Sequence, residues 1–132
     1  KSRLKGNLKC DRKFYLDVSL WKDMKERIHP KRRVLVSNLL HDREAVMLYS
    51  PTGVGKTWLS LAISLITAGK DSLELLDWQN EDPQPVCYVD GEMLEEDIQE
   101  RIKPLIPTLG VDQDLLRENF LFVSRVSQPH LI

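Results

Sequence analysis

The stretch SPTGVGKT, from Ser50 to Thr57, has the residue types and the spacing of a loop that binds phosphate. In such a loop the backbone N–H groups turn inward toward anionic oxygens, and glycines stand where a side chain would block that curl. The usual pattern is G-x-x-x-x-G-K-[ST], so Ser50 replaces the first glycine while the final Gly-Lys-Thr matches. An ordinary glycine turn between a strand and a helix is the alternative, and the Gly-x-Gly-Lys-Thr core favours the nucleotide site.

Each part of this loop has an expected chemical role. Lys56 supplies a positive charge for the β and γ phosphates, and the Thr57 hydroxyl ligates Mg²⁺. Trp58 comes next, where it either flanks the nucleotide or packs within the helix that follows. We therefore expect ATP and Mg²⁺ as cofactors, with nucleotide contacts from Pro51, Thr52, Gly53, Val54, Gly55, Lys56, Thr57 and Trp58.

A second group of candidate residues is Asp90-Gly91-Glu92, which follows the short apolar run Val86–Val89. In parallel sheets of nucleotide-binding folds, the carboxyl ends of the strands surround the site. A carboxylate there can polarise the attacking water or hold the water shell of the metal, so Asp90 is a candidate metal-site residue and Glu92 a candidate catalytic one. By itself this sequence is more often a plain turn followed by an acidic helix start, and the neighbouring phosphate loop reverses that preference in favour of the functional interpretation.

The segments around these residues alternate between strand and helix patterns. The apolar run Ala45–Tyr49 predicts a strand covered on both faces, and the apolar residues from 55 to 68 predict a buried helix that Gly69 ends. After the strand Val86–Val89, a second helix is expected around Leu94, Ile98 and Ile102, with Pro104 and Pro107 breaking it. A helical turn at Leu115–Arg117 and a strand at Asn119–Val123 complete the pattern. This alternation indicates an α/β fold with a parallel sheet and flanking helices.

Charge divides the chain at about residue 33. Residues 1–33 hold 12 basic and 4 acidic side chains, whereas residues 34–132 hold 7 and 16. We expect residues 1–33 to form a basic arm with a short amphipathic helix from Ser19 to Ile28, capped by Ser19, and residues 34–132 to form the core. The arm either binds nucleic acid or lies on its own acidic domain, and the sequence leaves both alternatives open.

The composition excludes several classes of protein. Hydrophobic residues make up 42% and charged ones 30%, which is the balance of a globular domain rather than of a disordered or fibrous chain. The longest apolar stretch is too short to cross a bilayer, which needs about 20 residues. Cys10 and Cys87 form no C-x-x-C pair and suggest reduced thiols without metal or disulfide. We expect a cytoplasmic protein with no membrane partner.

The two motifs together carry a family resemblance. The sequence AVMLYSPTGVGKTWLSLAISLITAG, followed after an insert by VCYVDGEMLEEDIQERI, resembles the RecA-like P-loop ATPases. It is most similar to their RepA-type branch, the replicative DNA helicases of plasmids and mobile elements. The match covers Val34 to about Ile106, and the strand that ends in Asp-Gly-Glu-Met is its most discriminating part. The resemblance implies that these residues form the N-terminal part of a RecA-like core, with the Walker B aspartate, sensor residues and DNA-contacting loops beyond Ile132.

The resemblance also implies a function. Gly53 to Thr57 would bind the ATP phosphates, and Glu92 would be the carboxylate that orients the attacking water. Family members act as oligomers, commonly hexameric rings, with an arginine supplied by the neighbouring subunit. We therefore expect the ATP-hydrolysing motor core of a DNA helicase that forms a homo-oligomer and binds single-stranded DNA. A nucleotide-dependent adaptor or loader without catalysis, and a small-molecule kinase built on the same loop, are the alternatives.

Overall fold

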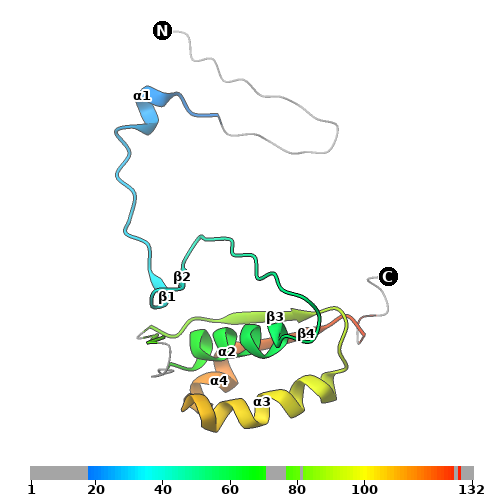
Figure 1. Cartoon of the computed structure of the whole chain (residues 1–132). Coiled ribbons are helices and arrows are strands. Elements are labelled where there is room, and N and C mark those ends of the chain that lie inside the picture. The colour runs from blue at the N-terminus through cyan, green and yellow to red at the C-terminus, as the bar shows by residue number, and fades with distance from the viewer. Residues whose placement is uncertain (1–17, 71–76, 81, 127, 129–132) are drawn as a thin grey trace. The chain divides into compact units, whose positions relative to one another are not determined.

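The computed structural model describes residues 18–70, 77–80, 82–126 and 128. The chain divides into two compact units, Lys1–Lys31 and Arg32–Ile132. The first unit contains α1 (Trp21–Met24), which is much shorter than the helix predicted from Ser19 to Ile28 (Figure 1). The prediction that Ser19 caps this helix is wrong, because its hydroxyl accepts a hydrogen bond from the Arg27 guanidinium at 3.0 Å and Leu20 is the capping residue. A helix of this length has few hydrogen bonds of its own, which is why periodicity alone overestimates it.

The second unit contains the other elements, and most of them lie where the sequence predicts. In order they are β1 (Val34–Val36), β2 (Leu40–His41), α2 (Lys56–Gly69), β3 (Val86–Asp90), α3 (Glu95–Leu109), α4 (Gln113–Asn119) and β4 (Phe120–Ser124). β1 and β2 pair antiparallel, whereas β3 and β4 pair in parallel from Val86↔Phe120 to Asp90↔Ser124. The predicted strands at 86–89 and 119–123 are confirmed, and their parallel pairing across α3 and α4 is compatible with the predicted α/β fold.

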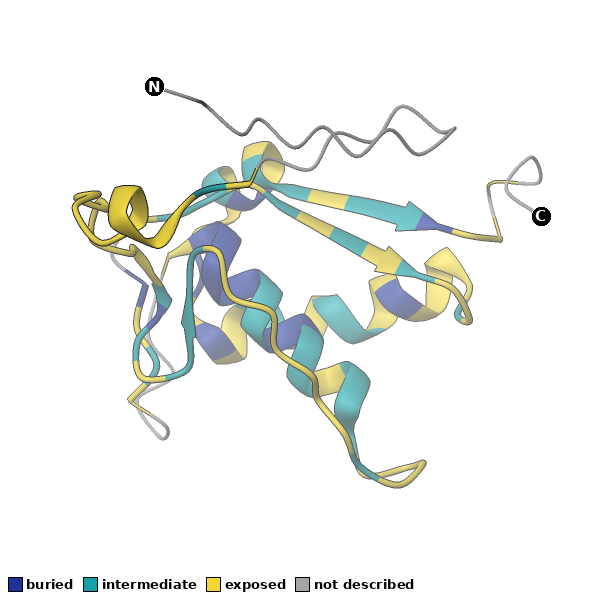
Figure 2. Cartoon of the chain, turned by 90° about the horizontal axis from the view of Figure 1, so that it is seen from above, coloured by how far each residue is buried: buried dark blue, intermediate teal, exposed yellow. Residues whose placement is uncertain are grey.

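The core lies on one face of the β3–β4 pair. Helices α2, α3 and α4 lie on that side of the strands in Figure 1, and burial is concentrated where these helices face the strands and one another (Figure 2). The fully buried side chains are mostly those of α2, with Leu61, Leu65 and Ile66 at the centre. On the opposite face of the strands, Val89 and Leu121 stay 68% and 58% exposed. Among the described residues, no helix has the length and apolarity to cross a membrane.

The segment Ala45–Tyr49 is not a strand, so that prediction is wrong. It precedes the phosphate loop as extended chain without a ladder partner among the described residues. Met47 and Tyr49 are each 90% exposed. An apolar run becomes a strand only when a neighbouring strand accepts its backbone hydrogen bonds, and within the described residues β3 and β4 pair only with each other. The phosphate loop is therefore held in place from its helix side.

The prediction that Pro104 and Pro107 break the second helix is also wrong. α3 continues through both prolines to Leu109 and ends at Gly110, whose φ of 65° is left-handed. Each proline removes one backbone hydrogen bond. Apolar side chains recur at helical spacing across both positions, with Ile98 and Leu109 buried and Ile102, Leu105 and Ile106 packed toward the core. This packing keeps the segment helical.

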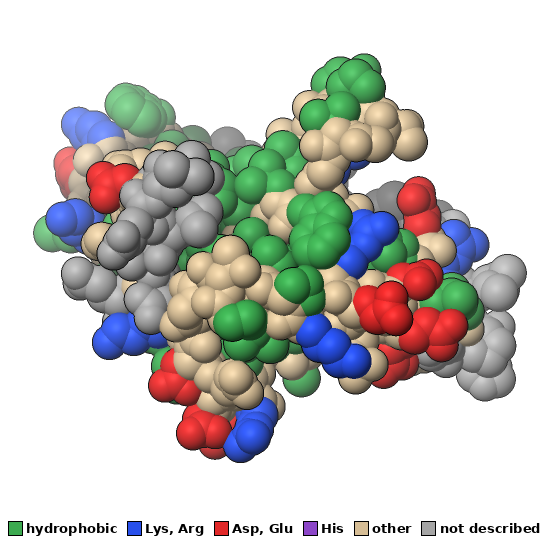
Figure 3. Space-filling model, turned by 60° about the horizontal axis from the view of Figure 1, so that its bottom comes forward, with side chains coloured by type: hydrophobic (Ala, Val, Ile, Leu, Met, Phe, Trp, Pro, Cys, Tyr) green, Lys and Arg blue, Asp and Glu red, His purple; other side chains and the backbone are tan. Residues whose placement is uncertain are grey.

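Acidic side chains gather over the start of α3, where Figure 3 shows them on the surface.

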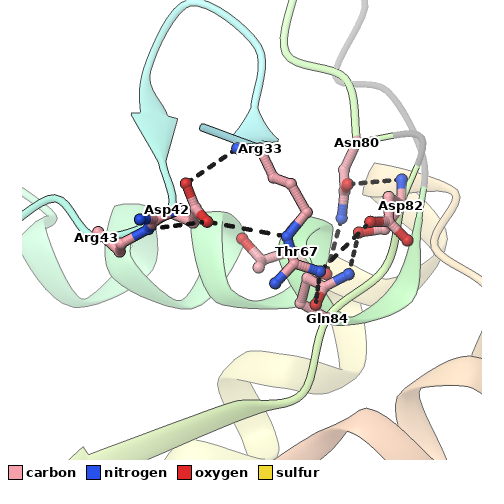
Figure 4. A network of polar contacts seen from close by, with 7 residues as sticks. All are labelled: Arg33, Asp42, Arg43, Thr67, Asn80, Asp82 and Gln84. Atoms are coloured by element: carbon pink, nitrogen blue, oxygen red, sulfur yellow. Dashed lines mark hydrogen bonds and ion pairs between the residues drawn. The ribbon is translucent and has the colours of Figure 1, made fainter. Parts of the chain in front are cut away.

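The C-terminal end of α2 is fixed by hydrogen bonds from several segments. The Asn80 side chain donates to the carbonyls of Ile66 and Thr67, and the Gln84 backbone also donates to Thr67 (Figure 4). The Asn119 amide donates to the Ala68 carbonyl, and the Asp112 backbone donates to Gly69. The last carbonyls of a helix have no partners within the helix. Each of the last four carbonyls of α2 has a hydrogen-bond partner outside the helix, so the C-terminal end of α2 is fixed. The phosphate loop is attached to the N-terminal end of this fixed helix.

Candidate nucleotide-binding site

The two glycines of the loop adopt backbone conformations that other residues rarely reach. Gly53 has φ = 85° and Gly55 has φ = 99°, both left-handed, and Gly55 is the residue that caps α2. A Cβ atom added at either position would meet nothing within 4 Å. The glycines are therefore required by the curl of the backbone rather than by lack of space. This curl is what lets consecutive N–H groups face one anion.

Lys56 closes the loop. Its ammonium donates to the carbonyl of Ser50 at 2.9 Å and to that of Pro51 at 2.8 Å. An ammonium has three donors, so a third remains for a phosphate oxygen. These bonds tie the serine at the start of the motif to the lysine at its end, which shows how the loop closes with Ser50 in the place of a glycine.

The start of α2 suits an anion. No acidic residue lies in its first turn, so no carboxylate of α2 competes for its free N–H groups. Thr57 is half-buried in this turn, and its hydroxyl makes no hydrogen bond among the described residues. Within the same described ranges, no three His, Cys, Asp or Glu side chains cluster to hold a metal. A cation here would therefore depend on phosphate oxygens in addition to protein oxygens such as the Thr57 hydroxyl.

The direction of β3 brings the second candidate group to the loop. The Gln84 backbone, just before β3, donates to the Thr67 carbonyl near the end of α2 at 2.9 Å. Further along β3, the Tyr88 hydroxyl lies 3.1 Å from the Ser60 hydroxyl, one turn from the start of α2. α2 and β3 therefore run antiparallel. At about 3.3 Å per strand residue and 1.5 Å per helix residue, the end of β3 reaches the level of the loop.

The turn after β3 uses one oxygen of Asp90. Its Oδ1 atom accepts the backbone N–H groups of Glu92 at 2.8 Å and of Met93 at 2.6 Å. This leaves Oδ2 of Asp90 for another partner. The Glu92 side chain is exposed and has no hydrogen bond within the described residues. The roles of Asp90 at the metal and of Glu92 in catalysis stay predictions.

A hollow beside the loop contains residues that the sequence analysis did not single out. It has a volume of 390 Å³ and is lined by Trp58, Met93, Asp97, Glu100 and Arg101. The Arg101 guanidinium lies 5.7 Å from the centre of the Trp58 ring. Trp58 thus faces outward, 42% exposed, instead of packing in the core. Arg101 gave no signal in the sequence because its contact joins helices 43 positions apart along the chain.

Comparison with known proteins agrees with this geometry. A family model described as AAA domain matches residues 10–128. The chain belongs to the AAA domain family. AAA domains are P-loop ATPase domains, so the match supports nucleotide binding and nucleotide-dependent ATPase activity for this domain. Searches of curated proteins and of solved structures give no match.

Proposed function

We propose that this AAA domain is the ATP-binding and ATP-hydrolysing motor core of a RecA-like DNA helicase of the RepA type. The observation that carries the proposal is the antiparallel arrangement of α2 and β3, which brings the Asp90-Gly91-Glu92 turn to the level of the phosphate loop. A loop alone would support nucleotide binding only. A carboxylate-bearing turn at the same end supports hydrolysis as well.

The residues of the loop and of the β3 turn have separate tasks in this proposal. The backbone N–H groups of Gly53–Thr57 and the Lys56 ammonium hold the phosphates, because all of them are hydrogen-bond donors at or next to the N-terminus of α2. The Thr57 hydroxyl and the free oxygen of Asp90 are the groups suited to Mg²⁺ and its water shell. Mg²⁺ neutralises phosphate charge when bound. Glu92, whose carboxylate makes no hydrogen bond within the described residues, orients the attacking water, so catalysis rests on positioning and electrostatics.

Two partners complete the proposal. Ring-forming ATPases complete their site with an arginine from a neighbouring subunit, and we propose a homo-oligomer here.

The basic residues before residue 34 are proposed to contact single-stranded DNA, because cations interleaved with Phe14, Tyr15 and Trp21 can meet phosphates while bases stack on the rings. Arg32 and Arg33 belong to the folded body, where they contact Glu44 at 3.0 Å and Asp42 at 3.9 Å. A deletion of residues 1–31 therefore spares these contacts.

The test is DNA-stimulated turnover. Addition of single-stranded DNA to the purified protein should raise the rate of ATP hydrolysis, and this stimulation should fall steeply as salt rises. Deletion of residues 1–31 should lower the DNA affinity and the salt dependence together. Phosphorylation of a nucleoside would instead show a kinase, and tight ATP binding without turnover would show an adaptor. Either result contradicts the motor.

A further inference from the structure

We propose that the Ser124 hydroxyl is a positioning group, which fixes the free carboxylate oxygen of Asp90 when hydrated Mg²⁺ binds at the phosphate loop. Ser124 is the last residue of β4 and is 4% exposed. Within the described part of the chain, its Oγ atom is the one buried side-chain oxygen or nitrogen without a hydrogen-bond partner. Buried polar side chains almost always have such a partner, so this exception requires an explanation. The inference rests on the proposed ATP site and adds a residue to it.

The pairing of the two strands places Ser124 beside Asp90. The two residues lie opposite each other in the parallel register of β3 and β4. Two positions earlier, the Tyr88 and Phe122 rings stack with their centres 6.2 Å apart, and the Tyr88 hydroxyl contacts Ser60 of α2. Side chains two residues apart on a strand share a face, so Asp90 and Ser124 both point to the helix side of the strands. Neighbouring strands are about 4.8 Å apart, so rotation of these side chains can bring the hydroxyl to the carboxylate.

The Asp90 carboxylate has an oxygen that such a hydroxyl can hold. Its Oδ1 atom accepts the backbone N–H groups of Glu92 at 2.8 Å and of Met93 at 2.6 Å. Its Oδ2 atom accepts no hydrogen bond within the described residues, and the proposed function assigns this oxygen to the water shell of Mg²⁺. Carboxylates that serve a metal are usually held by further hydrogen bonds. The Ser124 hydroxyl can donate to Oδ2 while its own oxygen still accepts a bond from a water.

This role predicts an unusual effect on stability. In the nucleotide-free protein the Ser124 hydroxyl has lost its water and has gained no partner, so it lowers the stability of the fold. Ser124→Ala should therefore leave the urea midpoint of the nucleotide-free protein unchanged or raise it. A serine with a purely structural hydrogen bond would show the opposite, because its removal lowers the midpoint.

The experiment measures binding of the non-hydrolysable ATP analogue AMP-PNP by calorimetry while Mg²⁺ is titrated, so the result does not depend on turnover. Ser124→Ala should raise the Mg²⁺ concentration for half-maximal binding by about ten- to a hundred-fold, and it should leave binding in EDTA unchanged. Ser124→Thr keeps the hydroxyl and should retain the Mg²⁺ requirement of the unaltered protein. Ser64→Ala is the matched control, because it removes a hydroxyl that donates to the Ser60 carbonyl at 2.8 Å within α2. This control should not change the requirement.

A double variant tests whether Ser124 acts through Asp90. Asp90→Asn alone should raise the Mg²⁺ requirement, and adding Ser124→Ala to it should cause no further rise, because both changes remove the same interaction. A lower urea midpoint in Ser124→Ala, or an unchanged Mg²⁺ requirement in Ser124→Ala beside a raised one in Asp90→Asn, would overturn the role of Ser124 alone. A full further rise in the double variant would overturn it as well. No binding of AMP-PNP by the unaltered protein would instead show that the proposed function is wrong, and the role of Ser124 with it.

Discussion

The hydroxyl groups of Ser60 and Tyr88 lie 3.1 Å apart and join α2 to β3 one turn away from the phosphate loop. The same Ser60 hydroxyl donates to the Thr57 carbonyl at 3.0 Å, so it is bonded to both the loop end of α2 and the strand. Together with the hydrogen bond from the Gln84 backbone to the Thr67 carbonyl, this contact aligns β3 with α2 and so helps to place the Asp90-Gly91-Glu92 turn at the level of the loop.

Removal of the Tyr88 hydroxyl should therefore destabilise the domain modestly. Tyr88→Phe loses one partly buried hydrogen bond, while Ser60 keeps its bond to Thr57, so the free energy of unfolding should fall by about 0.5–1.5 kcal/mol. Urea denaturation measures this change. Tyr49→Phe is the matched control, because Tyr49 is 90% exposed and should stay within about 0.5 kcal/mol of the unaltered protein. Equal effects of the two variants would show that the Ser60–Tyr88 contact contributes nothing.

Lys56 should dominate ATP affinity. A charge-assisted phosphate contact contributes about 1.5–3 kcal/mol, so Lys56→Ala should weaken ATP binding by roughly ten- to a hundred-fold. Calorimetry measures the affinity, and circular dichroism confirms the fold. Lys70→Ala removes the same charge beyond the opposite end of α2 and should leave the affinity unchanged. Unchanged affinity in folded Lys56→Ala protein would rule out the loop as the phosphate site.

Asp90 has two roles that a single substitution separates. In Asp90→Asn the amide oxygen can still accept the N–H groups of Glu92 and Met93, so the turn after β3 and the thermal stability should be nearly retained. The negative charge is lost, so the Mg²⁺ concentration needed for half-maximal turnover should rise. A magnesium titration of turnover checks this. An unaltered Mg²⁺ requirement would leave Asp90 with its structural role only.

Glu44 should make the β1–β2 region sensitive to acid. The backbone N–H of His41 donates to its carboxylate at 3.0 Å, and Arg32 lies at the same distance. The hydrogen bond from the His41 backbone N–H is the main cause that holds the pKa of Glu44 below its ordinary value of 4.5. The charges of His41 and Arg32 lower this pKa further. The contribution of Glu44 to the free energy of unfolding is therefore fully present above about pH 4.5, and it is lost as the pH falls through the lowered pKa of the folded state. Carboxyl carbon shifts in NMR spectra measure this pKa, and a midpoint at or above 4.5 contradicts the prediction.

The same region supplies a stability test. Glu44→Gln should lower the free energy of unfolding at about pH 6, and the difference from the unaltered protein should shrink as the pH falls through the lowered pKa of Glu44. The difference should be small at either pH, because the ion pair with Arg32 is largely exposed.

Local pattern was sufficient for much of this fold. The loop glycines, α2, β3, α4 and β4 follow from residue types and periodicity, because each of these elements carries its own pattern of turn residues or buried apolar positions. The family match also agrees with the prediction of a P-loop ATPase made from Gly53–Thr57. The RepA-type helicase branch stays a proposal.

The errors arise where neighbours rather than local pattern decide the outcome. Ala45–Tyr49 reads as a strand, but a strand depends on partners that a sequence run does not show. Pro104 and Pro107 were predicted to break the second helix because proline disfavours a helix interior. The apolar face of α3 packs against the core, and the helix continues through both prolines. Arg101 and the Ser60–Tyr88 contact could not be predicted, because both join segments far apart in the chain. Trp58, next to the loop, was the local sign of a nucleotide contact there, and its exposure could not be predicted from its place in an apolar helix.

The most direct test of the motor is the separation of binding from turnover at Glu92. Glu92→Gln keeps the size of the side chain and removes its charge. A positioned base contributes about 10²–10⁴-fold in rate, so turnover should fall by at least the lower of these factors while ATP affinity stays nearly normal. Single-turnover hydrolysis and calorimetry on the same preparation measure both quantities. Hydrolysis at the unaltered rate would contradict the account and leave Glu92 as an acidic residue in the turn between β3 and α3.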